Sequence, residues 1–361
     1  MATPFLLAPM AELSHRALRE LIEGFGFNGA DEYFTEMISA GGIVNGGSFE
    51  SWYMDNGPCP EKLVYQIAGG DEEMLLRALV LLDRKDCLGI DVNMGCSAPA
   101  IVRTGAGVRW MSDIEKSGAL IRRLRPHTKR RLSVKLRTGP SDDFDYLVRF
   151  CRRLEEEGVD LITLHPRTAK EKFKRKARWD YVSALRKELH VPLAGNGDIA
   201  SAEEMLSRSS ECDAVMIGRL AVRRPWVFAE AKGKAKNFTY EPYDHNERVW
   251  DQGSGNREQG TGNGELYQLS KHEDIQLCFR TKIPVPGPQS LIFETGLRFL
   301  ELLAKYQPPE FHISRARRFF GYFCDNLKWG TYVKNLLNRE TDLSGIERIW
   351  KTCFSGSPLE Y

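Results

Sequence analysis

The first 230 residues or so alternate between short apolar runs and longer segments with helical spacing. The apolar runs are rich in β-branched residues, and the segments between them carry apolar residues three and four positions apart. This alternation predicts a parallel sheet covered by helices, and eight units predict closure into a (β/α)8 TIM barrel. An open doubly wound sheet is the alternative. The eight predicted strands are Phe5–Ala8, Ala30–Thr35, Leu63–Ile67, Leu88–Asn93, Leu132–Leu136, Asp160–His165, Val191–Gly195 and Ala214–Gly218.

The clearest helical segments are Glu72–Asp83, Asp113–Leu124 and Phe144–Glu157. Ser112 and Ser141 precede the last two and are of the residue type that caps a helix start. We therefore expect both serines to begin helices on the outside of the barrel.

The chain has 361 residues, which exceeds the roughly 250 residues of a typical barrel. Residues 253–264 are polar, glycine-rich and without periodicity, as in a flexible linker. Helical spacing returns at Ser290–Tyr306 and Ile313–Leu337. The sequence therefore predicts a barrel domain over 1–238, an irregular linker over 239–289 and a small all-helical domain over 290–361.

The composition excludes several classes of protein. A formal net charge of +2 is too small to indicate a nucleic-acid partner by itself. No run of about 18 apolar residues predicts a membrane span, and the N-terminus lacks the pattern of a secretory leader. The eight cysteines form no C-x-x-C pair and no zinc spacing with histidine, so neither a metal nor a disulfide framework is expected. These features predict a cytoplasmic protein.

Unusual side chains lie at the C-terminal ends of the predicted strands, the end of a barrel where functional residues gather. Any one of them has an ordinary explanation, since a lone cysteine is usually a small buried side chain. Their convergence on one rim is what indicates a site. In chain order they are Ala8-Pro9-Met10, Glu36-Met37, Gln66, Asp91 to Cys96, Lys135 and Arg137, His165-Pro166-Arg167, Asn196-Gly197-Asp198 and Gly218-Arg219.

The last two strand ends are typical of a phosphate site. Gly197 and Gly218 allow close approach of backbone N–H groups, and Arg219 adds positive charge. Lys135, on the fifth strand, is suited to lie beside the pyrimidine edge of a flavin, where a cation stabilises the reduced ring. A Schiff-base lysine or a phosphate-binding lysine remains open at this position.

The ordered set of strand ends resembles the dihydrouridine synthase family over about residues 5–230, and the C-terminal helices resemble that family's RNA-binding domain. The residues that carry the resemblance are Ala8-Pro9-Met10, Thr35-Glu36-Met37, Asn93-Met94-Gly95-Cys96, Lys135-Leu136-Arg137-Thr138-Gly139, His165-Pro166-Arg167-Thr168 with Trp179, Asn196-Gly197-Asp198 and Gly218-Arg219.

The resemblance implies FMN at the barrel mouth, reduced by NADPH, and a uridine in tRNA or other structured RNA as substrate. Cys96 matches the catalytic cysteine, which would protonate C5 of uracil while flavin hydride reaches C6. Asn93 and Arg137 match positions near the target base. The residues that match cofactor-binding positions are Ala8, Pro9, Met10, Gln66, Lys135, His165, Asn196, Gly197, Asp198, Gly218 and Arg219.

Two features depart from the family pattern. Ser97 follows the cysteine where the family has proline, and Val108-Arg109-Trp110 is bulkier than the small residues expected there. Both departures concern the loop behind Cys96.

The segment Lys170–Arg178 is strongly basic, with Glu171 as its one acidic residue. It follows the sixth predicted strand, so we expect it on the active-site rim in contact with RNA phosphates. Substrate contacts are predicted for Arg167, Lys172, Lys174, Arg175 and Lys176. Two alternatives remain: another FMN barrel that acts on a small molecule, and an RNA-binding homologue without catalysis.

Overall fold

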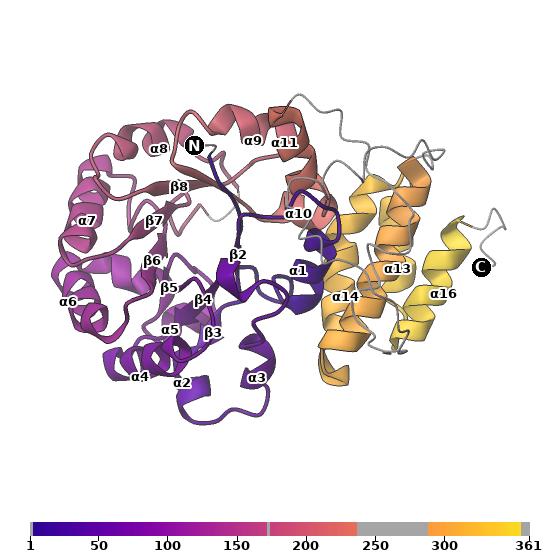
Figure 1. The fold of residues 1–361 in the computed structure, drawn as a ribbon, viewed down its shortest axis with the longest axis horizontal. Helices are drawn as coiled ribbons and strands as arrows, with labels where there is room; N and C mark the ends of the chain where they lie inside the picture. The colour runs from indigo at the N-terminus through magenta and orange to yellow at the C-terminus, as the bar shows by residue number, and fades with distance from the viewer. Residues whose placement is uncertain (1–2, 172–173, 237–287, 355–361) are drawn as a thin grey trace, which may run out of the picture.

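The computed structural model describes residues 3–171, 174–236 and 288–354. Its centre is a closed barrel of eight parallel strands (Figure 1). These strands are β1 (Phe5–Leu7), β2 (Glu32–Phe34), β4 (Leu63–Ala68), β5 (Gly89–Met94), β6 (Arg131–Leu136), β7 (Leu161–Leu164), β8 (Leu193–Asn196) and β9 (Ala214–Ile217).

The barrel closes because β1 pairs with both β2 and β9, and β2 pairs with β4. Each of the eight predicted strands coincides with one strand of the barrel, so the predicted TIM barrel is confirmed over the open sheet. A short strand that the sequence pattern did not reveal, β3 (Ile38–Ser39), continues beyond β2 and pairs with the end of β4.

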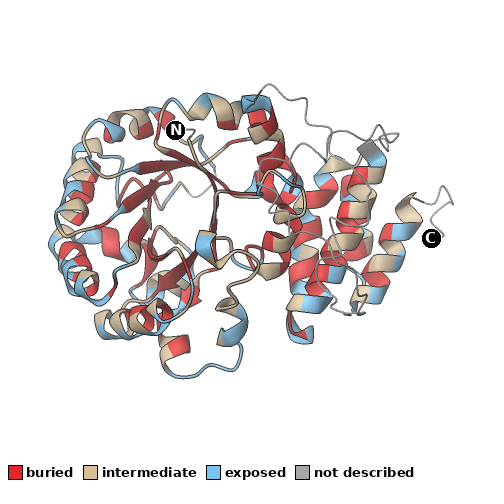
Figure 2. Ribbon diagram, in the orientation of Figure 1, coloured by how far each residue is buried: buried red, intermediate tan, exposed pale blue. Residues whose placement is uncertain are grey.

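The outer layer consists of helices that lie between the strands (Figure 1). The main ones are α1 (Arg16–Glu23), α4 (Glu72–Asp83), α6 (Ile114–Leu124), α7 (Phe144–Glu156), α8 (Trp179–Arg186), α9 (Ala202–Arg208), α10 (Arg219–Arg223) and α11 (Val227–Ala235). Strands are covered on both faces, and every residue of β4 and β5 is buried (Figure 2).

The predicted helix caps at Ser112 and Ser141 are wrong. Asp113 caps α6 by accepting the Lys116 N–H at 2.9 Å, and Asp143 caps α7 by accepting the Tyr146 N–H at 2.9 Å. An N-cap side chain accepts from a backbone N–H two or three residues ahead. An aspartate lies closer to each helix start than the serine does, and it takes that position.

Smaller elements interrupt the connections at the strand ends. Between β3 and β4 lie α2 (Ala40–Val44), α3 (Glu50–Tyr53) and the 3-10 turn η1 (Pro60–Lys62). Between β5 and α6 lie α5 (Pro99–Arg103) and η2 (Gly107–Ser112), and η3 (Arg125–His127) precedes β6.

Helices follow the barrel at the C-terminus, as predicted. They are α13 (Pro288–Tyr306), α14 (Pro309–Phe323), the turn η4 (Cys324–Asn326), α15 (Gly330–Leu337) and α16 (Leu343–Phe354). The single helical segment expected over Ile313–Leu337 is divided at η4. Gly330 explains the sharp turn there, because a Cβ at this residue would lie 2.0 Å from the Cys324 carbonyl oxygen.

The C-terminal helices pack directly on the barrel. Helix α13 lies against α1, and α14 lies against α10 (Figure 1). Phe299 and Phe319 stack with ring centroids 3.7 Å apart and belong to the same hydrophobic core as the barrel's outer layer. The predicted linker over 239–289 lies outside the described residues, except for its last two positions, which belong to α13. Within the described ranges, no helix is long and apolar enough to cross a membrane.

Candidate active site

Cys96 lies just beyond β5, on a turn held by a side-chain amide. The Oδ1 atom of Asn93 accepts the N–H of Cys96 at 2.9 Å and the N–H of Gly95 at 3.2 Å. The Cys96 carbonyl accepts the Val108 N–H at 3.0 Å. The cysteine is half-buried. Its backbone is therefore fixed on both sides while its side chain keeps access to the barrel mouth.

The loop behind Cys96 depends on one glycine and one tryptophan. Gly107 has φ +63°, and a Cβ at this position would lie 2.3 Å from the Cys96 carbonyl oxygen. Trp110 is 3% exposed and donates from Nε1 to the Gly69 carbonyl at 2.8 Å. The bulky Val108-Arg109-Trp110 sequence thus anchors the loop to the end of β4. Sequence reasoning noticed this departure but not its role.

A buried polar network lies beneath this turn. The Nδ2 atom of Asn93 donates to Gln66 Oε1 at 2.8 Å, and Gln66 Nε2 donates to Asp91 Oδ2 at 2.7 Å. The Ser133 hydroxyl donates to Asp91 Oδ1 at 2.7 Å. Burial raises the pKa of Asp91 to about 6, although the hydrogen bonds from Ser133 and Gln66 act in the opposite direction. Asp91 was in the rim motif but was not predicted as a site residue.

Lys135 lies inside the mouth of the barrel, on β6. Its ammonium donates to Asn196 Oδ1 at 3.0 Å, and Asn196 Nδ2 donates to the Met216 carbonyl at 2.8 Å. Burial, and next the nearby Arg137 guanidinium, lower the pKa of Lys135 to about 8. The structure therefore brings together Lys135 and Asn196 as the sequence predicted.

His165, Arg167 and Asp198 form a second cluster, at the ends of β7 and β8. Arg167 Nη1 lies 3.0 Å from His165 Nε2, and Arg167 Nη2 forms an ion pair with Asp198. Because a guanidinium only donates, Nε2 of His165 is the acceptor. Burial, followed by the surrounding cations, holds the pKa of His165 well below its usual value. The pKa of Asp198 is lowered because its bonds to Arg167 and to the Ala177 N–H outweigh burial.

Arg137 joins two of the rim loops. Its Nε donates to the Gly95 carbonyl at 2.9 Å, and its Nη1 donates to the Thr168 carbonyl at 3.3 Å. The guanidinium thus lies beside the turn that carries Cys96. Arg167, also predicted to contact substrate, is 2% exposed and lies deeper, among His165 and Asp198.

The ends of the first and last strands meet in an apolar surface. A Cβ on Gly218 would lie 3.2 Å from Met10 Sδ and 3.6 Å from Ala8 Cβ. Pro9 connects Ala8 and Met10 on the same strand end. Arg219 begins α10 directly behind β9, and its Nη2 lies 3.5 Å from Asp198 Oδ1.

Exposed basic side chains of the segment after β7 are Lys170, Lys174, Arg175 and Lys176. Arg178, by contrast, is paired with Glu171 at 3.0 Å and with Asp142 at 3.0 Å. Lys172 lies outside the described residues. In the described part of the segment, the exposed positive charge is therefore carried by these four side chains, of which Arg175 lies 4.0 Å from Glu171.

Glu36, another rim residue, contacts the C-terminal helices. Its Oε2 forms an ion pair with Arg315 of α14 at 2.9 Å, and its Oε1 accepts the Glu12 N–H at 2.6 Å. Both side chains of the pair are less than 5% exposed. Burial raises the pKa of Glu36, and Arg315 partly offsets that effect. Sequence reasoning could not assign this partner, which lies 279 residues away in the chain.

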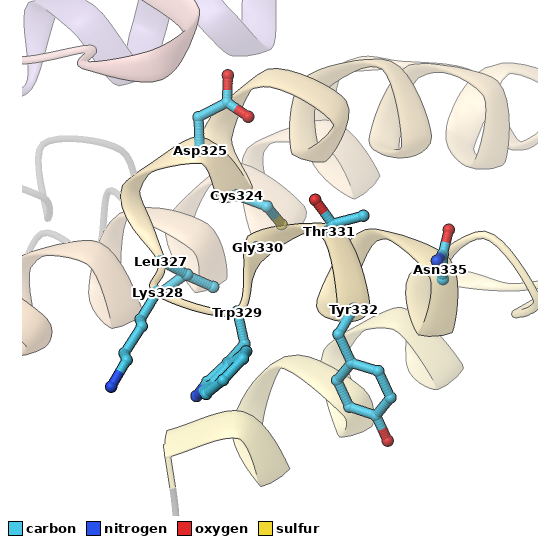
Figure 3. Close-up of a pocket in the computed structure, with 9 residues that line it drawn as sticks. All are labelled: Cys324, Asp325, Leu327, Lys328, Trp329, Gly330, Thr331, Tyr332 and Asn335. Carbon is cyan, nitrogen blue, oxygen red and sulfur yellow. The ribbon is translucent and has the colours of Figure 1, made fainter.

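A second surface feature lies on the helical domain. Residues around η4 and the start of α15 line a shallow hollow of about 630 Å³ (Figure 3). Trp329 is 69% exposed there, and Tyr332 is 37% exposed. Lys328, Trp329 and Tyr332 project to the same side, away from Asp325 (Figure 3). Asp325 itself is paired with Lys334 and with Arg223.

The closed barrel, with a half-buried cysteine and several cations at the carboxyl ends of its strands, defines an α/β-barrel enzyme. Comparison with known proteins makes this specific. Residues 6–254 match the family described as dihydrouridine synthase (Dus), and the chain belongs to this family, whose members are oxidoreductases. The resemblance predicted from the strand ends is therefore confirmed.

Individual relatives agree with this assignment. The chain is 34% identical over 248 residues to a probable tRNA-dihydrouridine synthase of Aquifex aeolicus, covering 63% of this chain and 72% of that protein. It is 32% identical over 234 residues to a probable tRNA-dihydrouridine synthase of Rhizobium leguminosarum, covering 64% and 72%. A human tRNA-dihydrouridine(47) synthase [NAD(P)(+)]-like protein is 28% identical over 229 residues, covering 63% of this chain and 35% of that protein.

Proposed function

We propose that this enzyme reduces specific uridines in tRNA to 5,6-dihydrouridine, with FMN as cofactor, NADPH as reductant and Cys96 as proton donor. The observation that carries the proposal is the placement of Cys96 at one barrel mouth together with Lys135, Arg137 and the cluster of His165, Arg167 and Asp198. Membership of the dihydrouridine synthase family supports it against a small-molecule FMN barrel and against a non-catalytic RNA-binding homologue.

The residues of the mouth fit a flavin mononucleotide. Lys135 and Arg219 supply positive charge for an anionic group, while the charge of Arg167 is balanced by Asp198. Ala8 and Met10 supply an apolar surface suited to a ring, and Gln66 supplies an amide. We propose that the residues that hold FMN are Ala8, Pro9, Met10, Gln66, Lys135, His165, Asn196, Gly197, Asp198, Gly218 and Arg219. When bound and reduced by NADPH, FMN would supply the hydride for C6 of uracil.

In this scheme the side chains of the protein orient the base and transfer one proton. The Cys96 thiol would act as the general acid that protonates C5. Asn93 and Arg137 flank the thiol and would hold the uracil. Because the site lies at the end of a closed barrel, the target nucleotide has to leave its stack to reach it.

We further propose two surfaces that contact the RNA. One is the exposed cationic group Lys174, Arg175 and Lys176, with Lys172 beside it in sequence. The other is the hollow around Trp329, on the helical domain, where an exposed ring next to Lys328 can stack on an unpaired base. The proposed domain boundaries are accordingly 1–238 for the catalytic barrel, 239–289 for the linker and 290–361 for an RNA-binding domain.

The central test is Cys96→Ala. Loss of a general acid should slow uridine reduction by roughly 10²–10⁴, while reduction of the bound flavin by NADPH stays at the wild-type rate. The two half-reactions are measured separately, by stopped-flow absorbance and by dihydrouridine content of the RNA. Heat-released cofactor should be FMN. A wild-type rate of uridine reduction in the variant, or release of FAD, would contradict the proposal.

The Trp329 surface has its own test. Trp329→Ala should weaken tRNA binding by about 1–3 kcal/mol, the usual contribution of one stacked base, and Trp329→Phe should retain most of the affinity because it keeps a ring. Binding is measured by fluorescence anisotropy with labelled tRNA. Equal affinity of the alanine and wild-type proteins would remove this surface from the RNA interface.

A further inference from the structure

A continuous path of hydrogen bonds runs from a buried carboxylate to the backbone of Cys96. It passes from Asp91 on β5 to Gln66 on β4, returns to Asn93 on β5 and ends at the N–H of Cys96, with bonds of 2.7, 2.8 and 2.9 Å. Asp91 is fully buried, and Gln66 and Asn93 are 1% and 8% exposed. Water therefore has little access to these three side chains.

The chemistry of the first member dictates the direction of the others. An ionised carboxylate only accepts hydrogen bonds, so it must face the Nε2 end of Gln66. The Oε1 end of Gln66 then faces Asn93 and requires the Nδ2 end of that amide. The Oδ1 end of Asn93 is consequently left toward the N–H groups of Gly95 and Cys96. Each bond in the structure has this polarity.

Reversal of either amide would be costly. With Gln66 turned over, its oxygen would face the Asp91 oxygen across 2.7 Å, and its NH₂ group would face that of Asn93. A buried polar group that loses its partner costs about 1–3 kcal/mol. A reversed Asn93 would present its NH₂ group to two backbone N–H groups, and the turn that carries Cys96 would lose its anchor.

We propose that Asp91 is a positioning residue for Cys96, because it fixes the direction of the Gln66 and Asn93 amides and, through them, the Cys96 backbone. The proposal rests on the proposed role of Cys96 in uridine reduction. Asp91 does not itself bond to Cys96. The charged groups that act on the Asp91 carboxylate are Lys135 and Arg131, both on β6, and both lower its pKa.

Ser133 provides a matched control. It donates to the other oxygen of the same carboxylate, Oδ1, at 2.7 Å, but it lies off the path to Cys96. Ser133→Ala and Asp91→Ala each remove one buried polar group of this network, yet only the second removes the acceptor for Gln66. Asp91→Asn is the conservative variant, because its amide can present Oδ1 to Gln66 and its NH₂ group to the Ser133 oxygen.

The experiment compares these variants in the flavin-loaded enzyme by two readouts. The first readout is a pair of rates measured separately: the reduction of uridine in tRNA and the reduction of the bound flavin by NADPH. The second, which needs no RNA, is the rate at which iodoacetamide alkylates Cys96, followed by mass spectrometry of its peptide. Gln66→Met is added as a second disruption of the path, in case Asp91→Ala does not fold.

Asp91→Ala and Gln66→Met should lower kcat for uridine reduction by roughly 10- to 100-fold, because a displacement of about 1 Å can cost about 100-fold. They should also speed alkylation of Cys96 several-fold, because the turn is released. Ser133→Ala and Asp91→Asn should stay within about threefold of wild type in both readouts. Equal effects of Asp91→Ala and Ser133→Ala, or an unchanged alkylation rate in both path variants, would overturn the proposal. A wild-type enzyme without uridine reduction would contradict the proposed function instead, and the alkylation rates would still decide whether Asp91 positions Cys96.

Discussion

Lys135 shows how strongly the barrel changes a single side chain. In water its ammonium would stay charged to high pH, but burial inside the mouth lowers its pKa to about 8. The Asn196 amide oxygen is its hydrogen-bond acceptor in the structure. The charge on Lys135 therefore depends on pH within a range where most lysines do not titrate.

This predicts a pH-dependent affinity for the cofactor. Lys135 is a cation below pH about 8 and becomes neutral above it, so the affinity of the apo-protein for FMN should fall as pH rises through this value. A charge-assisted hydrogen bond contributes about 1.5–3 kcal/mol, so the loss should be roughly tenfold or more. Flavin fluorescence titrations between pH 7 and 9.5 measure it.

Lys135→Met is the control for that titration. It should bind FMN more weakly at pH 7, and its affinity should change little between pH 7 and 9.5. A variant that retains the wild-type pH dependence would assign the titration to another group.

A site residue could be predicted from the sequence only where its position at a strand end was enough to place it at the barrel mouth. Cys96, Lys135 and Asn196 lie at or just beyond the ends of strands whose order was readable, so their convergence could be foreseen. The contacts of Asp91 and Trp110 could not, because strand order brings residues to one rim without saying which side chains bond: Asp91 accepts from Gln66 of β4, and Trp110 donates to Gly69 just after β4. Arg167 illustrates the same limit, since its burial follows from its bonds to His165 and Asp198 rather than from its position in the chain.

At the scale of elements, the strands were predicted best, because a buried parallel strand is a short, nearly continuous apolar run. Helix starts were less well defined. Serine and aspartate are both good caps, and the choice between Ser112 and Asp113 depends on the backbone of the preceding turn. The end of α14 was missed because its apolar spacing continues through η4 and into α15, and the turn depends on the fit of Gly330.

The segment after β7 carries a prediction at this scale. Neutralising Lys174, Arg175 and Lys176 together should weaken tRNA binding and flatten its dependence on salt, since each lost phosphate contact reduces the slope by roughly 0.7–0.9. Reduction of flavin by NADPH should not change. The affinity for tRNA is measured at several salt concentrations.

A matched triple variant tests whether position matters. Lys85, Lys129 and Lys187 precede β5, β6 and β8, at the opposite end of the barrel. Their neutralisation removes the same charge and should leave the salt slope nearly intact. If both triple variants flatten the slope equally, the RNA responds to total charge and the rim segment has no special contact.

At the scale of the whole molecule, the barrel and the C-terminal helices are joined through their interiors. The Glu36–Arg315 ion pair crosses between them, and Arg315 also bonds to Gln307 and lies over the Phe311 ring at 4.5 Å. Aromatic side chains of α13 and α14 complete the contact with α1 and α10.

Removal of one partner of this pair should be strongly destabilising. Arg315→Ala leaves the Glu36 carboxylate buried without its cation, and such a change typically costs about 3–5 kcal/mol. The double variant Glu36→Met with Arg315→Met should lose less than Arg315→Ala, because no buried charge remains. Urea unfolding of the wild type, Arg315→Ala, both single methionine variants and the double variant measures these losses and the coupling between the two charges. Strictly additive losses would show that the two charges do not depend on each other.

The same ion pair has a consequence for how this chain can be recombined with its relatives. A helical domain taken from a family member that lacks a cation at the place of Arg315 would leave the Glu36 carboxylate without its partner in a dry interface. The residue at position 36 of the barrel and the residue at position 315 of the helical domain must therefore be compatible in charge. Either half can diverge in sequence only in step with the other, and a chimera that respects this requirement must exchange both residues at once.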